Sequence, residues 1–72
     1  MVQRYRKKKG KWKDTRYNDL EDVKKTYRKL TLNNEEIQFL ELKNGLLLVV
    51  ISTMLEIKIE VYREIREEDE GE

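Results

Sequence analysis

Residues 55–61 constrain the fold of this chain most strongly, because they alternate aliphatic and charged side chains without interruption. On an α-helix the four aliphatic side chains would scatter around the axis, whereas on a β-strand they line one face. We therefore predict a strand over 55–61. Its charged side chains are typical of a strand protected at the edge of a sheet.

An Asn44-Gly45 pair lies between two apolar runs just before this strand. Both central residues of a tight hairpin turn need positive φ, which Asn and Gly accept most readily. The pair therefore predicts a hairpin between strands at 37–43 and 46–51. A two-residue turn would place five aliphatic side chains on one face of this hairpin: Leu40, Leu42, Leu47, Val49 and Ile51.

The connection to the third strand decides whether its aliphatic residues join that face, because side chains alternate between faces with a period of two. An odd number of linking residues, such as 52–54, would bring Leu55, Ile57 and Ile59 to the same face. We expect this odd connection, and a single long bent strand is the alternative.

Residues 18–30 have the spacing of an amphipathic helix. Apolar side chains recur at steps of three, four and three residues, and either Asn18 or Asp19 can cap the N-terminus. Acidic residues in the first turn and basic residues in the last turn favour the helix dipole. The apolar face of this helix consists of Leu20, Val23, Tyr27 and Leu30.

These elements predict an α+β fold, with one amphipathic N-terminal helix followed by a three-stranded antiparallel meander. Two alternatives stay open. In the first, residues 24–32 form a strand that turns at Asn33-Asn34, giving a small all-β, barrel-like meander. In the second, the chain is mostly helical and ends in a coiled-coil stem, whose heptad would consist of Leu47, Val50, Met54, Ile57 and Val61.

The charge of the chain is divided between its two parts. Residues 1–30 hold twelve basic side chains against four acidic ones, and residues 31–72 hold four against eleven. Residues 1–16 and 66–72 offer too little apolar surface to offset the entropy cost of ordering. We therefore expect a disordered basic arm at 1–16, one small folded domain at 17–65 and a disordered acidic tail at 66–72.

The basic arm and the helix cations indicate a small, non-enzymatic nucleic-acid-binding protein without sequence specificity, acting as an oligomer. Lys and Arg neutralise phosphates, and aromatic rings stack on unpaired bases. Trp12 is either such a stacking residue or an anchor on the folded body. The candidate binding residues are Arg4, Tyr5, Arg6, Lys7, Lys8, Lys9, Lys11, Trp12, Lys13, Arg16, Lys24, Lys25, Arg28 and Lys29.

The hydrophobic surplus of the predicted meander indicates a homo-oligomer. A sheet of three strands with one helix leaves one apolar face uncovered, and such a face marks an interface. The chain has 72 residues and no Cys, so oligomerisation is the expected additional source of stability. The predicted interface consists of Ile37, Phe39, Leu46, Leu48 and Val50.

Two other functions stay open: a protein–protein interaction or assembly module whose charged ends only solubilise, and a regulator whose acidic tail engages a basic partner. The arm would then be solvated or paired with the tail of its own chain. No His or Cys is present and no catalytic carboxylate arrangement is apparent, so we expect no enzyme, no small-molecule substrate, no metal and no cofactor.

The longest apolar run, 46–51, is far shorter than the roughly 20 residues of a membrane span. No apolar segment of a secretory signal follows the N-terminal charges, so we expect a cytoplasmic, soluble protein without membrane contact.

Overall fold

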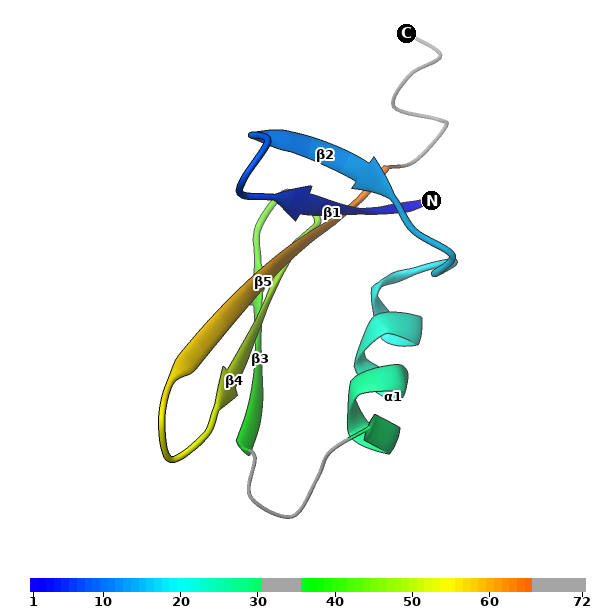
Figure 1. Ribbon diagram of the computed structural model, residues 1–72. Coiled ribbons are helices and arrows are strands. Elements are labelled where there is room, and N and C mark those ends of the chain that lie inside the picture. Colours follow the sequence, from blue (N-terminus) through cyan, green and yellow to red (C-terminus); the bar gives the residue numbers. More distant parts are fainter. Residues whose placement is uncertain (31–35, 66–72) are drawn as a thin grey trace, which may run out of the picture.

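The computed structural model describes residues 1–30 and 36–65, which form a five-stranded antiparallel sheet with one helix on one side (Figure 1). The strands are β1 (Val2–Arg6), β2 (Lys11–Asp14), β3 (Glu36–Leu42), β4 (Leu46–Ser52) and β5 (Ile57–Glu64), and helix α1 (Leu20–Leu30) connects β2 to β3. Across the sheet the order is β2-β1-β5-β4-β3. The first and last strands in the sequence are therefore neighbours, and β5 is the central strand.

The expected helix with a three-stranded meander is wrong, because the sheet has five strands. The basic segment that was expected to be disordered contributes two of them, β1 and β2. Its anchor is Val2, whose side chain is fully buried, and Thr15 donates both its backbone N–H and its hydroxyl to the Val2 carbonyl. The expected acidic tail at 66–72 lies outside the described residues.

Both alternative folds are also excluded. The region 24–30 is helical, so it does not provide the strand of a barrel-like meander. The proposed coiled-coil heptad falls on β4, β5 and the turn between them. Its β-branched residues pack well on a pleated surface and lose rotamer freedom in a helix.

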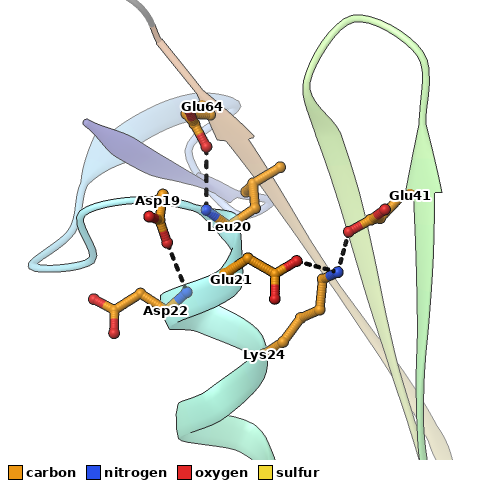
Figure 2. A network of polar contacts seen from close by, with 7 residues as sticks. All are labelled: Asp19, Leu20, Glu21, Asp22, Lys24, Glu41 and Glu64. Carbon is orange, nitrogen blue, oxygen red and sulfur yellow. Dashed lines mark hydrogen bonds and ion pairs between the residues drawn. The ribbon is translucent and has the colours of Figure 1, made fainter.

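Helix α1 begins at an aspartate cap. The Asp19 carboxylate accepts a hydrogen bond from the Asp22 N–H at 2.9 Å, and the Asp22 carboxylate accepts one from the Asn18 N–H at 3.2 Å. Figure 2 shows that the same end of the helix is tied to the sheet, since the Leu20 N–H donates to Glu64 of β5. One turn later, Lys24 forms ion pairs with Glu21 and with Glu41 of β3.

The turn at Asn44-Gly45 is present, with φ of 71° at both residues. However, three residues link the strands instead of two, because Leu42 pairs with Leu46 and Leu40 pairs with Leu48. This shift by one residue reverses the faces of β3. Leu40 and Leu42 point away from the helix, while Phe39 packs edge-to-face on Tyr27 of α1. The larger aromatic side chain thus takes the buried face.

The connection from β4 to β5 is even rather than odd, since Ser52 pairs with Ile57 and residues 53–56 form the turn. The Thr53 hydroxyl shapes this turn by accepting hydrogen bonds from the Leu55 and Glu56 N–H groups. The aliphatic side chains of β5 therefore lie on the open side, away from the helix. Only the last part of β5 is interior to the sheet, because β1 pairs with residues 62–64 while β4 pairs along residues 57–63.

A core of five side chains lies between α1 and the sheet. It comprises Val2, Val23, Leu47, Val49 and Tyr62, all almost inaccessible to solvent. Tyr62 is the largest of them and contacts Tyr17 and Tyr27 edge-to-face. Its hydroxyl lies 2.8 Å from that of Tyr27, and burial raises the pKa of both phenols.

We predict that Asp19→Ala lowers the free energy of unfolding by about 1 kcal/mol, because it leaves the N–H of the first helical turn without its acceptor. Urea unfolding followed by circular dichroism measures the change. Asn18→Ala is the matched control and should change stability by less than about 0.5 kcal/mol. A larger loss in the control would show that the cap is Asn18.

We also predict a loss of stability at alkaline pH. Tyr62 has an ordinary pKa of 10.0 when unfolded and a raised pKa in the fold, so its contribution is complete below that pH and decreases above it. Between the pKa of a phenol in the unfolded chain and its pKa in the fold, each buried phenol should lower the free energy of unfolding by about 1.4 kcal/mol per pH unit. Lys24, whose pKa is raised by Glu41 and then Glu21, adds a loss in the same direction.

Comparison with Tyr62→Phe isolates the phenol. Urea unfolding between pH 9 and pH 12 should show a shallower decline for this variant than for the wild type. Identical slopes for the two proteins would contradict the assignment.

Candidate nucleic-acid interface

Cationic side chains of β1 and β2 alternate along the strands and gather on the helix side of the sheet. In the register of the hairpin, Arg4 lies opposite Lys13 and Arg6 lies opposite Lys11. Like charges directly across a strand pair destabilise a sheet. The hairpin therefore keeps four cations together at a cost to folding, which makes them candidates for a function.

A surface groove runs beside these cations. One hollow of about 420 Å³ is lined by Arg4, Arg6, Lys13, Asp14, Thr15, Arg16, Tyr17 and Tyr62. A second hollow, of about 280 Å³, is lined by Arg4, Tyr5, Arg6, Lys7, Lys8 and Glu60. Because the two hollows share Arg4 and Arg6, we treat them as one feature. We call it the basic groove and define it by Arg4, Arg6, Lys7, Lys8, Lys13 and Arg16.

The basic groove exists because β1 leaves β5 early. The last paired residues of the two strands are Arg4 and Tyr62, after which β1 continues in contact with β2 alone. A turn at residues 7–10 follows, in which Gly10 has a φ of 63° and donates its N–H to the Arg6 carbonyl. Lys7 reaches back across the gap and donates to the Ile59 carbonyl at 2.6 Å.

The cations of the basic groove lack acidic partners among the described residues. Within residues 1–30 and 36–65, none of them has a carboxylate at ion-pair distance. Asp14, which borders the groove, instead accepts a hydrogen bond from the Gln3 amide at 2.7 Å. Lys24 offers the contrast, since its ammonium lies between two glutamates (Figure 2).

The aromatic residues predicted to stack on bases lie on the opposite side of the hairpin. Tyr5 and Trp12 contact each other edge-to-face at 5.3 Å between ring centroids. The Arg63 guanidinium lies 4.3 Å from the Trp12 ring centroid and donates two hydrogen bonds to the Gln3 amide oxygen. Trp12 thus contacts the sheet, as in the anchor interpretation. Tyr17 and Tyr62 line the first hollow of the groove, and Tyr5 lines only the second.

The remaining predicted cations are dispersed. Lys9 lies in the β1–β2 turn, while Lys11 stays beside the groove, opposite Arg6, without lining either hollow. On α1, Lys24 is ion-paired and Arg28 lies over the Phe39 ring at 5.6 Å, while Lys25 and Lys29 are exposed. The four helix cations do not line the groove, so the predicted continuation of positive charge along the helix is not formed there.

The predicted oligomer interface is divided between the two sides of the sheet. Leu46, Leu48 and Val50 lie on the open side, away from α1. Ile37 and Phe39 lie on the helix side and pack against the core instead. The one-residue shift at the β3–β4 turn accounts for this difference, because it exchanges the faces of β3 and leaves β4 unchanged.

Comparison with known proteins finds no matching family, no matching curated protein and no matching solved structure. In the described part of the chain, no helix is long and apolar enough to cross a membrane. The same residues contain no group of three or more potential ligands placed to hold a metal ion.

We predict that Lys13→Thr raises the free energy of unfolding by about 0.2–1 kcal/mol, because it removes one cation from a directly opposed pair. Urea unfolding at low ionic strength measures this gain. In 1 M NaCl, where the screening length falls to about 3 Å, most of the gain should disappear. A loss of stability at both salt concentrations would show that Lys13 has a structural role.

Proposed function

We propose that this protein binds nucleic acid without sequence specificity, and without enzymatic activity, through the basic groove. The observation that carries the proposal is that two like-charge pairs stand opposite each other in the β1–β2 register, Arg4 with Lys13 and Arg6 with Lys11. This arrangement opposes folding, and a polyanion held against it would remove the repulsion. Phosphates of a nucleic-acid backbone have the charge and the linear spacing for such a ladder.

The binding energy would come from phosphate neutralisation. Residues two apart on a strand are separated by roughly 7 Å on the same face, so Arg4 and Arg6 can contact successive anionic groups. Each neutralised phosphate releases condensed counterions, which makes the affinity depend steeply on salt. Arg side chains suit this role because the guanidinium can bind a phosphate through two hydrogen bonds.

The position of Tyr17 favours single-stranded nucleic acid as the ligand. The Tyr17 side chain is half-buried at the wall of the groove, with its ring held by Tyr62, so little conformational entropy is lost when a base stacks on it. A base reaches this ring only where the strand is open. The alternative functions, an assembly module and an acidic-tail regulator, give the groove cations no role.

The experiment measures fluorescence anisotropy of labelled single-stranded and double-stranded oligonucleotides across a salt series. Two charge-matched double variants are compared with the wild type. Arg4→Gln/Arg6→Gln removes two cations from the groove, and Lys25→Gln/Lys29→Gln removes two from the exposed side of α1. Circular dichroism confirms that both variants are folded.

We expect the groove variant to reduce the slope of log affinity against log salt by about 1.4 for the single strand, because each lost phosphate contact removes about 0.7. The helix variant should keep a slope near that of the wild type. Equal losses in the two variants would indicate a general charge effect and contradict the groove. Binding that does not respond to salt would contradict the proposal as a whole.

A further inference from the structure

The side of the sheet opposite α1 carries a continuous apolar surface over three strands. The pairing places Leu40, Leu48 and Val61 in one row across β3, β4 and β5. Neighbouring rows add aliphatic residues above and below it. We call this surface the open face and define it by Leu40, Leu42, Leu46, Leu48, Val50, Ile57, Ile59 and Val61.

Several of these side chains are unusually exposed for their type. Leu40 is 51% accessible and Ile57 is 68% accessible. The open face continues into the β4–β5 turn, where Met54 and Leu55 are almost fully accessible at 93% and 96%. A single exposed aliphatic residue is normal on a protein surface, but a contiguous group of this extent marks an interaction site.

The open face is also almost free of charge in a chain that is 43% charged. On the same side of β3, β4 and β5, only Glu36 and Arg63 are charged, and both lie at the ends of their strands. Arg63 is occupied by Trp12 and Gln3. The helix side of β5 shows the opposite composition, with Lys58, Glu60 and Glu64.

We propose that a second copy of this chain covers the open face, so that two sheets pack back to back. A surface without charge needs no charge complementarity from its partner, and the net charge of +1 gives two copies little reason to repel each other. A two-fold axis then matches each aliphatic row with an equivalent row. A lipid surface fits less well, because Glu36 and Glu56 flank the open face near the exposed turn and oppose anionic headgroups.

The available area agrees with a dimer. A specific interface begins at about 1,000 Å² of total buried surface, or about 500 Å² from each copy. The open face and the Met54-Leu55 turn can supply apolar surface of this order, because six of their side chains are between 41% and 96% accessible. The small core of each chain, with five fully buried side chains in the described residues, gives a physical reason for this additional burial.

The dimer would determine how many nucleic-acid strands are bound at once, and this part of the inference rests on the proposed function. Each groove lies on the helix side of its sheet, whereas the dimer interface uses the other side. Two sheets packed back to back therefore direct their grooves outward. The dimer would hold two nucleic-acid strands at once instead of binding one strand more tightly.

Sedimentation equilibrium of the full chain without nucleic acid tests the interface. We expect the wild type to have the mass of a dimer, and Leu40→Lys to have half that mass because it places a charge inside the interface. Leu30→Lys is the matched control, since Leu30 is 65% accessible on α1 and lies outside the open face. Ile59→Lys, at a partly exposed position on the central strand, is a second interface variant. Circular dichroism verifies the fold of each protein.

Capture of a free labelled strand by an immobilised strand then tests the two-strand arrangement. The wild type and Leu30→Lys should capture the free strand, whereas Leu40→Lys should bind a single short strand normally and lose the capture. A wild type that stays monomeric at millimolar concentration would overturn the inference. So would a dimer that persists in both interface variants, because it would point to pairing elsewhere, such as the β3 edge. A dimer that binds no nucleic acid would contradict the proposed function and leave the interface standing.

Discussion

The short ladder between β1 and β5 is the interaction on which the rest of this structure depends. It contains three residue pairs, from Val2 opposite Glu64 to Arg4 opposite Tyr62. These pairs join the two ends of the described chain, bury Val2 in the core and place β5 at the centre of the sheet. The ladder also ends early, and the groove opens where β1 diverges. Folding and the candidate binding site therefore have the same structural origin.

The two sides of the sheet separate the chemical properties that the linear sequence mixes. Near β1 and β2, the helix side is cationic, and α1 leaves it uncovered because the helix packs on β3 and β5. On β3, β4 and β5 the open side is aliphatic. The sheet thus keeps a cationic surface and an aliphatic surface on opposite sides, so that one can be covered while the other stays accessible.

The sequence was sufficient to predict elements that depend on local chemistry. The cap is Asp19, one of the two predicted candidates, and strands form over Leu46–Ser52 and Ile57–Glu64, close to the predicted 46–51 and 55–61. Leu46, Leu48 and Val50 share one face of β4. The sequence was insufficient where one residue decides the outcome, as at Asn44-Gly45, since a shift of one position reverses every side chain of β3. The N-terminal hairpin departs from the expected disordered arm, because its basic composition is typical of disorder whereas its period of two is that of a strand. The alternations Arg4-Tyr5-Arg6 and Lys11-Trp12-Lys13 around Gly10 are a strand signal, and the two segments pair with each other. The hairpin joins the sheet only through the pairing of β1 with β5, about sixty residues away in the sequence.

The β1–β2 hairpin pairs cations with cations, a pattern that sequence rules for strand pairing do not predict. Strand pairing alone would favour opposite charges at Arg4 and Lys13 and at Arg6 and Lys11. The hairpin tolerates the repulsion because its other side is strongly held. There, Trp12 packs between Tyr5 and Arg63, and Gln3 links Arg63 to Asp14. The contacts on the open side thus offset the repulsion between the cations on the helix side. The aromatic residues therefore stabilise the strands that carry the cations of the candidate site.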